Sequence, residues 1–430
     1  MAAPSAMVAK LTQPDRSRLL LSNLSESLAV KIRPADRHSR SRAARCLRLL
    51  LAAPLLGLCG AAAPAQAQNA CSLHFSSDVD WIKTPAGKLM GEVSAVAIDA
   101  RDHLWVLHRP RTIAEADRAR ALPAVVEFDP TGRFVQAFGG PDEGYDWPTV
   151  EHSIAVDKRG HIWVAGSYRA EAAKADDMIV ELTRQGKFVR QIGARGASKG
   201  NADTASVHAP GDLYVDDKRN ELYVADGYGN RRLIVFDART GAFRRMWSAF
   251  GKAPPMEDAP PPRKPGEPFA PETGEGPEGF NGVHGVRVSN DGIIYVSDRN
   301  NQRIQLFTRS GRYLRQMFVD RNMTSAQTAS GMAFSRDSAQ RYLYVADFGN
   351  TRMLVFDRKR LKLVSAFGAK GSGRGQFTGP HLIAVNSKGD VFVAEVQGRR
   401  VQRLSDLRLD RSATPSAGAR LTVEAQPGGC

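Results

Sequence analysis

The chain has 430 residues, of which 42% are hydrophobic and 24% are charged, so it is long enough for one large β domain or two ordinary domains with a buried core. Residues 1–67 carry +7 of the formal net charge of +15, and the remaining charge is spread along the chain without a basic run. This distribution indicates a solvated, mildly basic surface and excludes a nucleic-acid footprint.

The first 67 residues have the pattern of a secretory signal. A stretch with five arginines precedes the apolar run Leu47–Ala63, which is followed by Ala65-Gln66-Ala67. A basic region, a short apolar region and an A-x-A site predict cleavage near Ala67 and export to a periplasm or out of the cell. The apolar run is too short and too often interrupted by glycine and proline to span a membrane.

One unit recurs six times after this segment. It consists of an alternating strand, a polar turn and a second strand such as Ile-Trp-Val or Leu-Tyr-Val, and the copies occupy residues 93–109, 152–167, 211–227, 284–299, 330–348 and 381–396. A third strand such as RLIVFD (232–237) follows each copy, and a fourth such as KFVRQIG (187–193) follows most of them. Four short strands per repeat predict an all-β fold, a six-bladed β-propeller with four antiparallel strands per blade.

The stretches VADGYGNRRL, VSDRNNQRI and VADFGNTRM resemble the core pattern of NHL repeats, which supports a propeller over residues 68–410. Blade 6 has no evident fourth strand after Leu404, and we expect Val79–Lys83 to supply it and close the ring. The Pro-rich stretch 253–279 is expected to be a loop between blades 3 and 4, and residues 411–430 a C-terminal tail.

Two cysteines, Cys71 and Cys430, lie near the two ends of the mature chain. Because a propeller brings its ends together, they can form a disulfide in an oxidising compartment. Two free or lipid-modified thiols are an equally open alternative.

Three histidines share one register of the repeat. The residue that opens the first strand is a histidine in blades 2, 4 and 6 and a small residue in blades 1, 3 and 5, in the order Ser94, His152, Gly211, His284, Ser330 and His381. First strands line the channel, and alternate blades lie about 120° apart, so His152, His284 and His381 are expected to converge at one level. Three imidazoles with an open fourth position are typical of a catalytic zinc site. A polar, water-filled channel mouth is the alternative.

A second register lies just past the end of the second strand, at the same face. Arg109 in blade 1 and Arg299 in blade 4 occupy it, and arginine is suited to bidentate recognition of a carboxylate. Blade 3 has one extra residue before its third strand, and we expect this bulge to push Tyr228 toward the channel; a surface tyrosine in a turn is the alternative.

The motifs LWVLHRP (104–110), VEHSIAVD (150–157), ADGYGNRRL (225–233), VHGVRV (283–288), SDRNNQRIQ (297–305) and GPHLIAV (379–385) resemble those of the peptidyl-α-hydroxyglycine α-amidating lyase family, also called peptidylamidoglycolate lyase. The resemblance implies zinc on His152, His284 and His381, and catalytic roles for Arg109, Tyr228 and Arg299. It also implies cleavage of peptidyl-α-hydroxyglycine to a peptide amide and glyoxylate, with Tyr228 as the base if the metal or an arginine stabilises its phenolate.

The chain departs from that family at two positions. Leu382 stands where the family has an aspartate after the third histidine, so we expect no calcium, and Gly229 replaces a disulfide-forming cysteine.

The substrate is expected to be a small molecule or peptide bearing a carboxylate, acted on by a monomer. Two other functions stay open: a non-catalytic NHL propeller that binds a peptide, protein or sugar, and a lactonase, whose class uses a carboxylate and asparagine metal cage.

Overall fold

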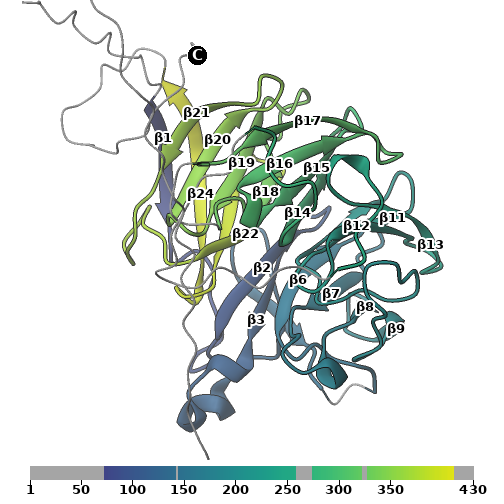
Figure 1. The fold of residues 1–430 in the computed structure, drawn as a ribbon. Coiled ribbons are helices and arrows are strands. Elements are labelled where there is room, and N and C mark those ends of the chain that lie inside the picture. Colours follow the sequence, from purple (N-terminus) through teal and green to yellow (C-terminus); the bar gives the residue numbers. More distant parts are fainter. Residues whose placement is uncertain (1–71, 142–143, 258–273, 322–326, 411–430) are drawn as a thin grey trace, which may run out of the picture. The chain divides into compact units, whose positions relative to one another are not determined.

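The computed structural model describes residues 72–141, 144–257, 274–321 and 327–410 (Figure 1). All strands of the described residues belong to six antiparallel four-stranded sheets, and the predicted six-bladed propeller is confirmed. The only helices in the described ranges are short 3-10 turns, namely η1 (Pro110–Thr112), η2 (Glu115–Arg120), η3 (Ala172–Lys174), η4 (Ala249–Gly251) and η5 (Arg299–Asn301).

Blades 1 to 5 run outward from the channel in chain order, and blade 6 does so except for its outermost strand, which comes from the start of the described chain. Blade 1 consists of β2 (Glu92–Ile98), β3 (Leu104–Arg109), β4 (Val125–Phe128) and β5 (Phe134–Phe138), and blade 2 of β6 (Glu151–Val156), β7 (Ile162–Gly166), β8 (Met178–Leu182) and β9 (Phe188–Gly193). Blade 3 consists of β10 (Asp212–Asp216), β11 (Glu221–Asp226), β12 (Arg232–Asp237) and β13 (Phe243–Trp247), and blade 4 of β14 (Val283–Val288), β15 (Ile294–Asp298), β16 (Arg303–Phe307) and β17 (Tyr313–Phe318). Blade 5 consists of β18 (Met332–Phe334), β19 (Tyr342–Asp347), β20 (Arg352–Asp357) and β21 (Lys362–Phe367), and blade 6 of β22 (Pro380–Val385), β23 (Val391–Glu395), β24 (Arg400–Asp410) and β1 (Ser72–Asp78).

The innermost strands β2, β6, β10, β14, β18 and β22 contact one another in a closed ring. The hydrophobic core is divided into six clusters, each lying between two neighbouring blades. One aromatic residue from the middle of each second strand is buried in a different cluster: Trp105, Trp163, Tyr223, Tyr295, Tyr344 and Phe392. The recurring aromatic residue therefore packs each blade against the next one.

The ring closes with a strand that lies upstream of the predicted one. Strand β1 pairs antiparallel with β24 as the outermost strand of blade 6, so the first and last described strands lie side by side (Figure 1). The expectation that Val79–Lys83 forms this strand is wrong, because Lys83 instead makes an isolated bridge to Arg133 in blade 1. Pairing the two ends removes a free sheet edge at the closure.

The NHL motif residues form buried ion pairs that join the end of each second strand to the start of the third. Arg232 Nε donates to Asp226 at 2.8 Å in blade 3, and Arg303 Nε donates to Asp298 at 2.7 Å in blade 4, with all four side chains fully buried. Asn301 also donates to Asp298, at 2.8 Å. These contacts fix the turns that carry Tyr228 and Arg299.

In blade 1, His108 occupies the position at which the other motifs have an aspartate. Because His108 is buried, we expect the stability of the folded protein to depend on pH. Gly91 N–H donates to its Nδ1 at 3.1 Å, and burial lowers the pKa of His108 to about 4. Between pH 6.5 and 4 the unfolded chain binds a proton here that the folded protein does not. Stability therefore falls as the pH is lowered, by about 1.4 kcal/mol per pH unit from this group.

The variant His108→Gln keeps an acceptor and a donor but cannot titrate. We expect its stability deficit relative to the parent to shrink as the pH falls from 6.5 to 4.5, as measured by urea unfolding. A deficit that stays constant across this range would contradict the assignment.

The predicted signal segment, the C-terminal tail, Cys71 and Cys430 lie outside the described residues. Among the residues that are described, no helix is both long and apolar enough to cross a membrane.

Candidate functional site

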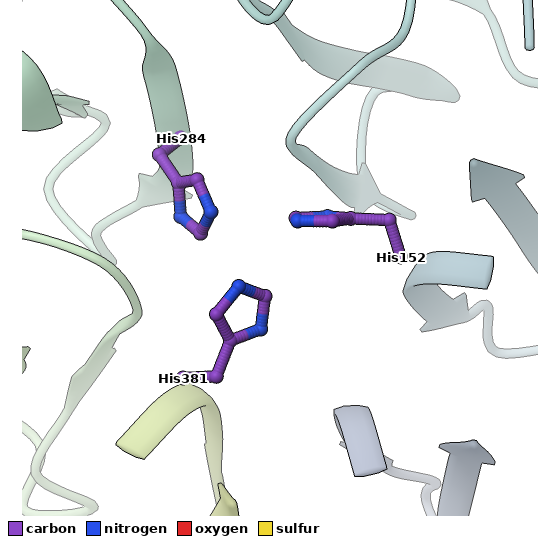
Figure 2. Close-up of side chains that lie close together, drawn as sticks. All are labelled: His152, His284 and His381. Carbon is purple, nitrogen blue, oxygen red and sulfur yellow. The ribbon is translucent and has the colours of Figure 1, made fainter. Parts of the chain in front are cut away.

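Three histidine rings meet in the channel. His152 extends from β6, His284 from β14 and His381 from β22, and each is at most 3% exposed. Their ring centroids lie 5.1, 4.8 and 4.8 Å apart, and one nitrogen from each lies within 4.8 Å of the others. Figure 2 shows the rings pointing toward one another from three separate strands.

The small residues of the alternating register orient these rings through their backbone. The Nδ1 atom of each histidine donates to a carbonyl in the next blade: His152 to Gly211 at 2.9 Å, His284 to Ser330 at 3.0 Å and His381 to Ser94 at 2.5 Å. A carbonyl can only accept, so Nδ1 carries the proton and each Nε2 keeps its lone pair. Orientation of a histidine by a backbone carbonyl is typical of metal ligands.

Tyr228 closes the group from the side of blade 3. Its hydroxyl lies 2.9 Å from His152 Nε2 and 3.0 Å from His284 Nε2. Within the described part of the chain, His381 Nε2 has no hydrogen-bond partner. One hydroxyl proton can satisfy only one of three buried lone pairs, and the other two would be left unpaired. A divalent cation with nitrogen ligands would satisfy all three, so these residues fit a metal ion.

Burial and nearby positive charge keep the three imidazoles neutral. Burial lowers the pKa of His381 to about 3, and the guanidinium groups of Arg109 and Arg299 add to the effect. Burial also lowers the pKa of His152 and His284 well below the ordinary value, again helped by neighbouring arginines. Neutral imidazole is the form that binds a metal.

The turn that carries Tyr228 has glycine on both sides because the backbone approaches its neighbours closely. A side chain at Gly227 would lie 2.2 Å from the carbonyl oxygen of Val283, and one at Gly229 would lie 1.8 Å from the ring of His208. The extra residue of blade 3 is thus packed against the strand that carries His284.

Arg299 is a buried cation that has no counter-ion among the described residues. It is 5% exposed, its Nη1 donates to the Tyr228 hydroxyl at 3.1 Å, and its guanidinium lies 5.1 Å from the tyrosine ring centroid. No carboxylate lies within ion-pair distance of it among the described residues. A buried, uncompensated guanidinium favours an anionic ligand.

Arg109 is held differently. Its Nη1 donates to Glu92 at 2.8 Å and its Nε donates to the carbonyl of Glu151 at 2.9 Å, which leaves Nη2 available. Arg109 ends β3 in blade 1 and its Nε contacts the backbone next to His152, and its charge contributes to the lowered pKa of His152 and His381. The structure thus brings all six predicted site residues together.

Two other groups of potential metal ligands contain an arginine in the place of a metal. In the group Asp99, His103 and Glu127, Arg184 donates to Asp99 at 2.8 Å and contacts Glu127. In the group Asp157, His161 and Glu181, Arg159 donates to Glu181 at 2.8 Å and contacts Asp157. The guanidinium groups satisfy these carboxylates, so neither group needs a metal.

The structure shows the surroundings of Leu382 and adds one residue, Phe348, that the sequence analysis did not single out. Leu382 is 1% exposed and packs in the apolar cluster between blades 1 and 2. Phe348 lies beside His381, with ring centroids 6.1 Å apart. The alignment of the repeats could have indicated Phe348, because this residue occupies in blade 5 the same register as Arg109 and Arg299 in blades 1 and 4.

Comparisons with known proteins agree with this architecture. The NHL repeat family matches residues 280–307. NHL repeat-containing protein 3 of Homo sapiens is 24% identical over 80% of this chain and 87% of its own length. A probable peptidyl-alpha-hydroxyglycine alpha-amidating lyase of Caenorhabditis elegans is 25% identical over 78% of this chain and 88% of its own length.

Peptidyl-glycine alpha-amidating monooxygenase B of Xenopus laevis is 22% identical over 80% of this chain, which spans 37% of that longer protein. These similarities confirm the resemblance to NHL propellers and to the amidating lyases.

Proposed function

We propose that this protein is a zinc-dependent carbon–nitrogen lyase that converts peptidyl-α-hydroxyglycine-like compounds to an amide and glyoxylate. The observation that carries the proposal is the convergence of three buried histidines, two of which contact the hydroxyl of Tyr228 through Nε2, next to Arg299, which has no carboxylate partner among the described residues. The similarity to an amidating lyase over most of its length supports the same reaction class.

His152, His284 and His381 would hold the zinc, which supplies a Lewis acid able to bind and acidify a hydroxyl group. Tyr228, whose hydroxyl oxygen accepts a hydrogen bond from Arg299 Nη1, would be the group that accepts the proton of the substrate hydroxyl. Arg109, anchored by Glu92 and by the Glu151 carbonyl, offers Nη2 to the substrate carboxylate.

The reaction needs no oxidant. The bond between nitrogen and the α-carbon breaks, and its electron pair goes to the nitrogen. The hydroxyl oxygen loses its proton to Tyr228 and becomes the aldehyde oxygen of glyoxylate. The same proton can return to the amide nitrogen, so atoms and charges balance.

The test is release of glyoxylate from N-benzoyl-α-hydroxyglycine by the purified, zinc-loaded protein. We expect catalytic release, and a decrease in kcat of about 10²–10³-fold in Arg299→Ala, because a positioned charge next to the base is lost. Absence of release, or release that Arg299→Ala leaves unchanged, would eliminate this function.

A non-catalytic NHL propeller is the second candidate, and Leu382 favours it. The side chain after the third histidine is apolar and buried, where the lyase family has a carboxylate. Such a protein would bind zinc and a carboxylate ligand but would not release glyoxylate.

We also propose that the propeller is exported and acts as a monomer on a carboxylate-bearing small molecule or peptide. The basis is the N-terminal signal pattern together with the free arginine donors of the site.

A further inference from the structure

Six residues, one from each blade, share a register beside the histidines and form a ring; this register is the last residue of the second strand in blade 1 and the residue after it in the other blades. In an antiparallel hairpin, the residue after the second strand lies beside the start of the first strand, where the histidines are. The residues at this register are, in blade order, Arg109, Ser167, Gly227, Arg299, Phe348 and Val396.

This ring has a polar arc and an apolar arc. Blades 1 to 4 contribute both arginines and, next to Gly227, the hydroxyl of Tyr228. Blades 5 and 6 contribute Phe348 and Val396 and no charged side chain at this register. The ring is therefore suited to a ligand with one anionic end and one apolar end.

Phe348 lies beside the histidine cluster in this arc. Its ring meets that of His381 nearly edge-on, at 74° and with centroids 6.1 Å apart, and the residue is half-buried. Gly379, with φ of +69°, faces it, and a side chain there would lie 3.1 Å from Phe348 Cε2. The glycine leaves the ring its space beside the site.

We propose that Phe348 is a specificity-determining residue that binds the acyl group next to the reacting carbon, so that the protein selects α-hydroxyglycine amides with a bulky apolar or aromatic acyl group. This inference rests on the proposed lyase function. The carboxylate of such a substrate needs the cations of blades 1 and 4, and the hydroxyl needs Tyr228. The acylamino end is then the part left to extend over blades 5 and 6, where aromatic contact with Phe348 stabilises it.

The experiment compares N-benzoyl- and N-acetyl-α-hydroxyglycine. For the parent protein we expect kcat/KM to favour the benzoyl compound by about tenfold, mainly through KM, since a phenyl ring buried against another contributes on this scale. Phe348→Ala should reduce the preference to about twofold or less, and Phe348→Leu should keep part of it. The matched control is Phe243→Ala, an exposed phenylalanine on the outer strand of blade 3, which should leave the ratio unchanged.

A binding measurement separates the two proposals. The unreactive N-benzoylglycine and N-acetylglycine are titrated into the zinc-loaded protein by calorimetry, with the benzoyl compound expected to bind about tenfold more tightly in a manner that depends on Phe348. Glyoxylate release without a benzoyl preference, or a preference that survives Phe348→Ala, overturns the role of Phe348 and leaves the lyase intact. Phe348-dependent binding without glyoxylate release overturns the lyase and keeps Phe348 as part of a binding site.

Discussion

Replacing His284 with alanine is expected to remove stoichiometric zinc from the purified protein. The ring of His284 is 1% exposed and holds one of the three lone pairs, while its Nδ1 is committed to the Ser330 carbonyl. No other described histidine or carboxylate is grouped with the remaining pair. Two nitrogen ligands bind zinc far less tightly than three, so the affinity should fall at least roughly 100-fold.

The measurement is the zinc content after dialysis, determined by elemental analysis. The matched control is His103→Asn, which alters a histidine in the group that contains Arg184. This variant should keep one zinc per chain, because a guanidinium already occupies that group. Zinc that persists in His284→Ala, or disappears in His103→Asn, would place the metal elsewhere. Thermal unfolding of both variants shows whether the fold is retained.

Replacing Tyr228 with phenylalanine is expected to lower kcat by about 10²–10⁴-fold while the zinc content is unchanged. Phenylalanine keeps the ring that packs against His152, with centroids 5.0 Å apart, and that lies under the Arg299 guanidinium. It removes only the hydroxyl that contacts two histidines and Arg299. The loss would therefore report proton transfer and not packing.

Tyr313→Phe serves as the control, since Tyr313 lies on β17, the outermost strand of blade 4, where its ring packs against Phe250 and Phe307. Its kcat should equal that of the parent. A Tyr228→Phe protein with normal kcat would show that another group accepts the hydroxyl proton. A variant that also loses zinc would instead make the tyrosine part of the metal site.

The repeat explains why so much of the fold and the site can be predicted from the sequence. The six copies align with one another. The copy to which a residue belongs therefore gives its blade, and its position within the copy gives its depth in the channel. His152, His284 and His381 are far apart in the chain, but they share one register and alternate blades. The same alignment places Arg109 and Arg299 at the mouth.

The closing strand could not be predicted in this way. Ser72–Asp78 lies before the first copy of the repeat, and it pairs with β24 only because the folded ring brings the two ends together. The pattern of hydrophobic residues in Val79–Lys83 is equally compatible with a strand. Only the long-range pairing distinguishes the two segments.

The amino-acid sequence by itself determined which side chains occupy the channel, because the repeat fixes register and register fixes direction. The tertiary structure decided their chemical state. It set the proton on Nδ1 through carbonyls of neighbouring blades and placed Phe348 against His381. It also paired Arg109 with Glu92, whereas Arg299 has no carboxylate partner in the part of the chain that the structure describes. Apart from the Arg109–Glu92 pair, which lies within blade 1, these contacts join residues of different blades, so they form only once the ring has folded.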